Sequence, residues 1–290
     1  MKRLLVLSNP TIDYIVYKGY GEVRAGGPGL YCGLYAGLYG YEPLVYGLLS
    51  PRDYSFIMSE YSKANVKLEC DFASSTQKFM LIYCRGGSRV ELSLSDCFAT
   101  KPLHRIEQLT RFSEVVIWSP TIAYEGVELE LPQRAYSDQV VSVDLQGVAR
   151  RPKYLPRVLK RLWRVEADYV HASISEVERL FGQRVDRIAD ILLCREVLIS
   201  NGDRELVIVE SGSRVWGAKP PIRVRGESTG AGDVLLSVYS ILRREYSLER
   251  AVRNAVANAS LHVKSLNNPG YRFGLREVEE YAGMISIYRL

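Results

Sequence analysis

Two glycines bracket an alanine directly before an aspartate in Gly230-Ala231-Gly232-Asp233. A β-branched run precedes this segment and a helical pattern follows it, so the segment joins a strand to a helix. The free N–H groups and the dipole at a helix start bind anions. A carboxylate beside bound phosphate is repelled, unless it takes a proton from an attacking hydroxyl. The segment therefore predicts phosphoryl transfer to an alcohol, with Asp233 as the base and residues 230–232 as the anion hole.

Two other interpretations of this segment remain open. Asp233 could simply balance the positive end of the helix dipole. Gly226-Glu227-Ser228-Thr229-Gly230 also fits G-x-S-x-G, the nucleophile elbow of serine hydrolases. A hydrolase needs a histidine after Ser228, and the only candidate, His262, lies inside a helical pattern, so the hydrolase is the weaker alternative. The sequence contains no Walker A, G-x-G-x-x-G or H-E-x-x-H motif.

The elements that must position these residues follow a strand–helix rhythm. Expected strands are 4–7, 12–17, 43–48, 66–70, 79–84, 90–94, 114–118, 140–144, 169–172, 197–200, 205–209, 214–217 and 222–225. Expected helices are 29–40, 54–64, 155–163, 174–181, 187–194, 232–243, 248–265 and 277–284. Strands separated by helices predict a mostly parallel sheet in an α/β fold. In such a sheet the ligand lies where strands end and helices begin.

Length and composition fit this α/β interpretation. The chain has 290 residues, of which 47% are hydrophobic and 24% charged, so it can bury the core of one large domain. No apolar run approaches the roughly 20 residues of a membrane span. The net charge, 38 − 33 = +5, is mild and spread out, which argues against a nucleic-acid partner. Five cysteines without a C-x-x-C pair argue against a zinc site and favour a reducing, cytoplasmic compartment.

Thr229-Gly230-Ala231-Gly232-Asp233 resembles the T-G-A-G-D signature of the PfkB (ribokinase-like) carbohydrate kinases. Further motifs resemble those of the family and occur in its order, from residue 4 to about residue 284. They are Asn9-Pro10-Thr11-Ile12-Asp13 for the opening strand, Gly26-Gly27 for the substrate floor, Ser173-Ile174-Ser175-Glu176 for N-x-x-E, and Ser200-Asn201-Gly202 for T-x-G. The resemblance implies a ribokinase-like three-layer sandwich around a central, mostly parallel sheet. Because only twelve residues separate Asp13 from Gly26, we expect a reduced β lid.

The resemblance also implies ATP-dependent phosphorylation of a small polyol, sugar or nucleoside by one domain, residues 1–290. Its acceptor-binding half is roughly 1–150 and its ATP-binding half roughly 165–290. The implied acceptor-binding residues are Asp13, Gly26, Gly27, Asp144, Gln146 and Arg150. The implied nucleotide-binding residues are Ser200, Gly202, Thr229 and Asn258, and Glu176 is implied to contact Mg²⁺ through water. No membrane partner is expected, and the chain is expected to be a monomer or a homodimer.

Two departures from the family pattern bear on activity and substrate. Ser173 stands where the family usually has asparagine, and Tyr31 stands where ribokinase-type members have a substrate-binding asparagine. They keep a second alternative open, a catalytically weak ligand-binding relative. The segment 144–150 follows D-x-Q-G-x-x-R, which resembles the archaeal myo-inositol kinase-like branch. This match argues against ribose or fructose phosphate as the obvious substrate.

Each implied site residue also has a plain structural interpretation. Strand-end caps would account for Asp13 and Asp144, turns for Gly26-Gly27, Ser200 and Gly202, surface charge for Arg150, a helix first turn for Glu176, and buried polar packing for Asn258. The three histidines, His104, His171 and His262, are expected to be structural.

Overall fold

Strand β1 (Lys2–Leu7) shows why helices cover the central sheet on both faces. Leu4 and Val6 belong to one buried apolar cluster, and Leu5 and Leu7 belong to another. Because successive side chains of a strand point to opposite faces, a strand that is apolar throughout must be covered on both sides. The structure, a computed structural model, describes residues 2–17, 19–84, 89–97, 103–123, 131, 133–182, 187–212, 214–224, 226–268 and 270–290.

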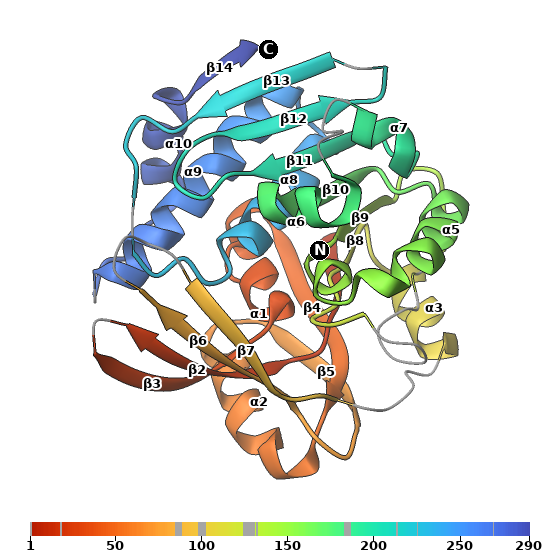
Figure 1. Ribbon diagram of the computed structural model, residues 1–290, viewed down its shortest axis with the longest axis vertical. Helices are drawn as coiled ribbons and strands as arrows, with labels where there is room; N and C mark the ends of the chain where they lie inside the picture. The colour runs from red at the N-terminus through yellow and green to blue at the C-terminus, as the bar shows by residue number, and fades with distance from the viewer. Residues whose placement is uncertain are drawn as a thin grey trace.

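Within those residues, ten strands form the large central sheet (Figure 1). Their spatial order is β14 (Ser286–Arg289), β13 (Arg214–Lys219), β12 (Leu206–Glu210), β11 (Glu196–Ser200), β10 (Tyr169–Ser173), β9 (Val140–Asp144), β8 (Val115–Trp118), β1, β4 (Tyr41–Leu49) and β5 (Lys67–Phe72). Each neighbouring pair of strands from β5 to β11 is parallel. The pairs β11–β12, β12–β13 and β13–β14 are antiparallel. Strands β4 and β5 lie on one side of β1 and strands β8 to β14 on the other, so the strand order reverses at β1. Parallel sheets commonly bind their ligands at such a reversal.

Helices pack on both faces of this sheet, as the expected α/β sandwich requires. One apolar cluster includes side chains of α1 (Pro28–Gly33), α2 (Tyr54–Lys63), α8 (Ala231–Arg243), α9 (Leu248–Asn267) and α10 (Leu275–Gly283). The other includes side chains of α3 (Leu103–Arg111), α4 (Gln146–Arg150), α5 (Leu155–Val165), α6 (Ile174–Phe181) and α7 (Ile188–Leu192). Short 3-10 turns lie at Ala36–Tyr39, Pro51–Asp53 and Pro152–Tyr154. The fold class expected from the sequence is confirmed.

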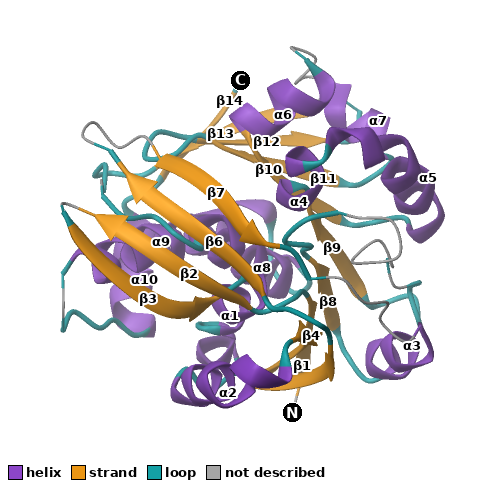
Figure 2. Cartoon of the chain, turned by 60° about the horizontal axis from the view of Figure 1, so that its bottom comes forward, coloured by secondary structure: helices purple, strands orange, loops and turns teal. Residues whose placement is uncertain are grey.

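A second, four-stranded sheet forms the lid in the described part of the chain (Figure 2). Its order is β3 (Tyr20–Gly26), β2 (Thr11–Tyr17), β6 (Gln77–Tyr83) and β7 (Arg89–Ser95). The short spacing between Asp13 and Gly26 is filled by one tight hairpin, in which Tyr17 pairs with Tyr20. The lid therefore brings Asp13 and the glycine pair to one end of the hairpin, where Thr11 pairs with Gly26.

Two expected elements differ from the structure. Residues 222–224 form no strand, and Arg225 lies outside the described residues. Strand β13 ends at Lys219 because Pro220 and Pro221 lack the N–H groups that a sheet ladder needs. The expected helix 29–40 breaks into α1 and the 3-10 turn Ala36–Tyr39, since its glycines weaken an α-helix.

Four elements were not expected from the sequence: β3, α3, α4 and β14. Strand β3 contains two glycines and is mostly exposed, so it shows no apolar period. Helix α4 has only five residues, and β14 only four, which is too short for a periodic signal. In the described ranges, no helix has the length and apolar character to cross a bilayer.

Candidate active site

Helix α8 begins at the glycine-rich segment. Gly230 precedes the helix with φ 78°, a left-handed conformation that favours glycine. A Cβ at this position would also overlap the ring of Tyr31. The first N–H groups of a helix have no partner within it, so those of Gly232 and Asp233 are available to an anion. Of the expected hole residues 230–232, Ala231 is already engaged, because its N–H donates to the carbonyl oxygen of Ser228 at 3.2 Å.

Asp233 lies buried in the first turn of α8. Its Oδ1 accepts hydrogen bonds from Gln146 Nε2 at 3.2 Å and from Ser119 Oγ at 3.5 Å. Burial raises the pKa of Asp233 to about 8, and the charge of Asp144 adds to this shift, while His171 opposes it. A carboxylate with a raised pKa is a stronger proton acceptor once ionised, which suits a general base near neutral pH.

A cavity of about 520 Å³, here called the large cavity, borders this first turn. Ser173, Glu176, Ser200 and Gly202 line it at or just beyond the ends of β10 and β11. Its apolar wall comes from β12, the loop before α8, and α9: Leu206, Ile222, Val224, Val256, Ala259 and Val263. An apolar slot beside helix N–H groups suits a ligand that carries a flat base and phosphates.

A smaller cavity of about 60 Å³, here called the lid cavity, lies on the inner side of the lid. Asp13 lines it, and its Oδ1 accepts a hydrogen bond from Thr11 Oγ1 at 2.7 Å. Burial raises the pKa of Asp13 to about 6, although that hydrogen bond and the charges of Arg24 and Arg150 oppose the shift. The carboxylate is thus held by few partners and can bind hydroxyl groups of a ligand.

The glycine pair sits tightly against this carboxylate. A Cβ on Gly26 would overlap the Asp13 carboxylate, and a Cβ on Gly27 would lie 2.8 Å from the carbonyl oxygen of Asn9. Gly27 itself lines the lid cavity. The two glycines therefore let the β2–β3 hairpin close against the backbone that follows β1.

The two cavities meet at Asp233. Both are lined by Arg89, Gln146, Gly230 and Asp233. A group bound in the large cavity and a hydroxyl bound in the lid cavity would therefore approach each other beside one carboxylate. This juxtaposition is the arrangement that a transfer reaction between two ligands needs.

Arg150 joins a chain of ion pairs that the sequence did not reveal. Its Nε lies 2.6 Å from Glu91 Oε1, and Arg89 Nη2 lies 3.0 Å from Glu91 Oε2. The Arg150 guanidinium also lies over the ring of Phe79, 4.9 Å from its centroid. Arg89, Glu91 and Arg150 all line the lid cavity, so lid strand β7 contributes two charged groups to the site.

Asp144 occupies a different place from the one the resemblance implies. It lines the large cavity and is not among the described residues that line the lid cavity. Its Oδ1 accepts a hydrogen bond from Gln146 N at 2.8 Å, and its Oδ2 lies 2.7 Å from His171 Nδ1. Sequence reasoning assigned His171 a structural role only, yet this side chain also lines the large cavity. Both carboxylate oxygens are engaged, so Asp144 has little capacity left for an acceptor.

Glu176 caps helix α6 while it lines the large cavity. Its Oε2 accepts a hydrogen bond from Ser173 N at 2.7 Å, and its own N–H donates to Ser173 Oγ at 3.4 Å. This capping box is the plain structural role anticipated for Glu176. Serine at 173 retains the cap, because its hydroxyl accepts the same bond that an asparagine side chain would accept.

Thr229 and Asn258 do not line the large cavity among the described residues. Thr229 lines the lid cavity, and its Oγ1 lies 2.6 Å from the hydroxyl of Tyr83 on the lid. Asn258 is fully buried and donates from Nδ2 to Tyr39 OH at 2.6 Å. The described α9 residues at the cavity are Val256, Ala259, Ser260 and Val263, and Asn258 lies on another face of the helix.

The hydrolase alternative finds no support in the geometry. His262 lies 2.9 Å from the carbonyl oxygen of Thr229 through Nε2 and 3.0 Å from Tyr35 OH through Nδ1. Both ring nitrogens are therefore engaged away from Ser228. Burial also lowers the pKa of His262 to about 4, which makes it a weak base.

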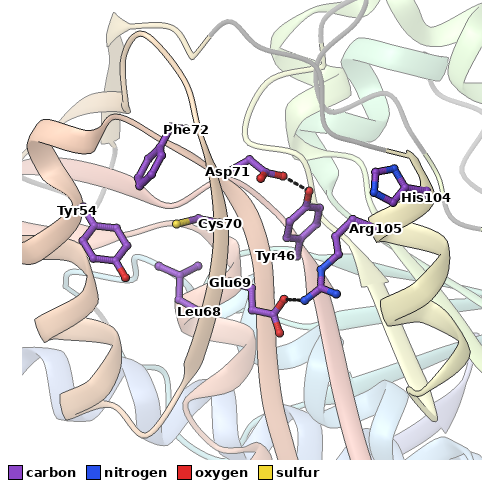
Figure 3. Close-up of a pocket in the computed structure, with 9 residues that line it drawn as sticks. All are labelled: Tyr46, Tyr54, Leu68, Glu69, Cys70, Asp71, Phe72, His104 and Arg105. Carbon is purple, nitrogen blue, oxygen red and sulfur yellow. Dashed lines mark hydrogen bonds and ion pairs between the residues drawn. The ribbon is translucent and has the colours of Figure 1, made fainter.

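A third cavity, of about 440 Å³, lies at the edge strand β5 and contains none of the expected site residues (Figure 3). Its charged groups pair with one another: Arg105 with Glu69, and Asp71 with the hydroxyl of Tyr46. Groups that satisfy each other leave little capacity to bind a ligand.

No family model matches the chain, and no curated protein matches it. Solved structures match over nearly its whole length. A probable sugar kinase from Rhizobium etli is 16% identical, covering 98% of this chain and 99% of its own, with a TM-score of 0.77. The nucleoside kinase of Methanocaldococcus jannaschii, an archaeal ribokinase-family member, is 15% identical over 98% of both chains, with a TM-score of 0.73. A pyrophosphate-dependent ribokinase-family kinase, solved with a pyrophosphate analogue and myo-inositol, is 17% identical, covering 96% and 99%, with a TM-score of 0.69. The chain therefore has the ribokinase-like fold.

Proposed function

We propose that the chain is a carbohydrate kinase of the ribokinase type, which transfers the terminal phosphate of ATP to a hydroxyl of a small polyol, sugar or nucleoside. One observation carries this proposal: Asp233, a buried carboxylate with a raised pKa, lines both cavities where they meet at the start of α8. A proton acceptor between an anion site and a hydroxyl-binding site is the arrangement that phosphoryl transfer to an alcohol needs.

Asp233 would take the proton of the acceptor hydroxyl as its oxygen attacks the terminal phosphorus. The backbone N–H groups at the start of α8 would stabilise the charge on the transferred oxygens. Gln146 holds the Asp233 carboxylate in place from α4. Arg89, from the lid, lines both cavities and would exclude water when the lid is closed.

The large cavity fits ATP better than a bare phosphate donor. Pyrophosphate has no apolar surface that could pack against the apolar wall of this cavity, whereas an adenine ring can pack against it. The described residues contain no cluster of three or more His, Cys, Asp or Glu that could hold a metal ion. Mg²⁺ would therefore be held by the phosphates and water, with Glu176 as an outer contact, which suits an ion that keeps its waters. When bound, Mg²⁺ supplies charge neutralisation of the phosphates.

The lid cavity supports an uncharged, single-ring acceptor, with myo-inositol as one candidate. Its two arginines pair with Glu91, and the acidic side chains of Asp13 and Asp233 also line it, which disfavours a sugar phosphate. The buried hydroxyl of Tyr31 has no hydrogen-bond partner among the described residues, and an acceptor hydroxyl would satisfy it. The ring of Tyr31, which lines the lid cavity, favours a cyclitol over ribose and leaves a nucleoside as the second choice.

In this proposal one half of the domain binds the acceptor and the other half binds ATP. Residues 1–150 supply most of the lid cavity, and residues 165–290 supply most of the large cavity. The start of α8 serves both, because Gly230 and Asp233 line each of them.

A panel of acceptors tests the proposal. ADP formation from MgATP is measured with myo-inositol, other cyclitols, ribose, fructose phosphates and nucleosides, and each product is identified by mass spectrometry. We expect turnover with a cyclitol or a nucleoside above ribose. Binding of ATP without turnover on any acceptor would support the alternative of a catalytically weak relative. Pyrophosphate as a donor better than ATP would overturn the assignment of the apolar slot.

Asp13→Ala is expected to raise the acceptor KM by about tenfold or more, because it removes charge-assisted hydrogen bonds to acceptor hydroxyls. The KM for ATP should stay within about twofold, since Asp13 lines the lid cavity only. The exposed Asp138, on the loop before β9, provides the matched control Asp138→Ala, which should leave both KM values alone. A change confined to the KM for ATP would place the acceptor elsewhere.

Activity is expected to fall with pH below about 8. Asp233 accepts a proton only as the carboxylate, and its pKa is raised to about 8. The ionised fraction then falls about tenfold for each pH unit below that value, and kcat/KM should follow it. The measurement is kcat/KM from about pH 5 to about pH 10. A profile that stays flat down to pH 5 would show that the titrating carboxylate is not the base.

A further inference from the structure

His171 lies at the end of β10 with both ring nitrogens engaged. Nδ1 is 2.7 Å from Asp144 Oδ2, and Nε2 is 3.1 Å from Ser200 Oγ. The side chain is almost fully buried, yet its ring lines the large cavity. A Cβ on Gly232 would lie only 2.7 Å from His171 Cε1, so the ring packs directly against the backbone that begins α8. His171 therefore contacts the strand ends and the anion hole at once.

Asp144 determines which protons the ring carries. A carboxylate only accepts hydrogen bonds, so Nδ1 must hold a hydrogen. Three acidic groups influence His171: Asp144 at the end of β9, Glu176 on α6 and Asp233 on α8. Burial alone would lower the pKa of His171, but the charge and hydrogen bond of Asp144, together with those other acids, raise it. These acidic groups favour the cationic ring, in which Nε2 carries a hydrogen as well.

The charge of the ring decides where the hydroxyl hydrogen of Ser200 points. If Nε2 carries a hydrogen, it donates to Ser200 Oγ, and the serine hydrogen is free to turn into the large cavity. If Nε2 is bare, it accepts the serine hydrogen, and only oxygen lone pairs face the cavity. Lone pairs repel the oxygens of a phosphate, whereas an O–H group binds them.

We propose that His171, held as a cation by Asp144, is a positioning residue that turns the hydroxyl of Ser200 towards the phosphates of the donor. This inference rests on the proposed function, because it takes the large cavity as the donor site. It also explains why Asp144 lies beside His171 rather than at the acceptor. The cation offsets the charge of the buried Asp144, which would otherwise repel an anionic donor.

The test measures MgATP affinity by calorimetry in His171→Gln, Ser200→Ala and the double variant. Each single variant should weaken MgATP binding about tenfold. The double variant should be no weaker than the worse single variant, because both changes remove one hydrogen-bond relay. The acceptor KM should not change. The exposed His104 gives the matched control, His104→Gln, which should bind MgATP like the unaltered chain.

A second readout needs no ligand. The chain has only three histidines, so ¹⁵N imidazole shifts can be assigned by single substitutions. At neutral pH the His171 nitrogens should both be protonated, and Asp144→Asn should remove this signature. A neutral His171 ring, additive losses in the double variant, or an effect on the acceptor KM alone would each overturn the inference. Ser200→Ala removes only a small hydroxyl, so it tests the relay even if His171→Gln fails to fold.

The same experiments separate this inference from the proposed function. If the unaltered chain does not bind MgATP, both fail together. If it binds MgATP and the variants bind equally well, only the relay fails. If the relay holds but no acceptor is phosphorylated, the donor site stands and the kinase activity fails.

Discussion

Asp233→Asn is expected to lower kcat by about 10²–10⁴ while MgATP still binds with nearly unchanged affinity. The amide keeps the shape of the side chain and can still accept a hydrogen bond from Gln146, but it cannot take a proton from the acceptor. MgATP affinity should hold near neutral pH and improve slightly above about pH 8, where Asp233 carries a buried negative charge beside the anion hole. Single-turnover kinetics and calorimetry of MgATP binding measure the two quantities separately.

The matched control addresses the alternative that Asp233 only balances a helix dipole. Asp190 lies in the first turn of α7, outside the residues that line either cavity, and Asp190→Asn removes the same charge from a helix start. A dipole effect would make the two variants alike, with a small change in the free energy of unfolding of about 0.3–1 kcal/mol. An Asp233→Asn variant that keeps a third or more of the original kcat would remove Asp233 from the mechanism.

The sequence predicted those parts of the fold that depend on local patterns. Strands and amphipathic helices can be recognised from the spacing of their apolar residues, and the glycine motif before α8 can be recognised from its residue types alone. The hairpin of the lid was missed in part, because β3 has glycines and few buried residues. The break of the expected helix 29–40 was missed because only its first part packs tightly: a Cβ on Gly29 or Gly33 would overlap Val45 or Val66, whereas one on Gly37 would meet nothing within 4 Å.

The parts of the site that were missed depend on distant partners. Asp144 and His171 lie 27 positions apart, and only the neighbouring strands β9 and β10 bring them together. The orientation of Asn258 could not be predicted, because α9 is lined by small residues on several faces and packs against both α8 and α10. The alternation of charged and apolar residues in β7 predicts the reverse of the observed arrangement, because Val90 and Leu92 are exposed while Glu91 lines the lid cavity, so the sequence held no usable signal for Arg89 and Glu91.

Gly230→Val is expected to lower kcat by at least about 10²-fold and to weaken MgATP binding, because it displaces the N–H groups of the anion hole. Valine disfavours the left-handed conformation that Gly230 adopts, at about 1–2 kcal/mol. Its side chain would also overlap the ring of Tyr31, and such overpacking costs about 1–3 kcal/mol more. The start of α8 must therefore move, or the Tyr31 ring must leave the lid cavity.

Gly40→Val separates the two costs. Gly40 has φ 74°, close to that of Gly230, but a Cβ there meets nothing within 4 Å, and the residue is exposed and lines neither cavity. Gly40→Val should lower the free energy of unfolding by only about 1–2 kcal/mol, which is what valine costs in the left-handed conformation, and its kcat should not change. Thermal unfolding and steady-state kinetics of both variants provide the comparison. A folded Gly230→Val protein with normal kcat and normal KM for ATP would show that phosphate does not bind at the start of α8, and the proposed donor site would have to be abandoned.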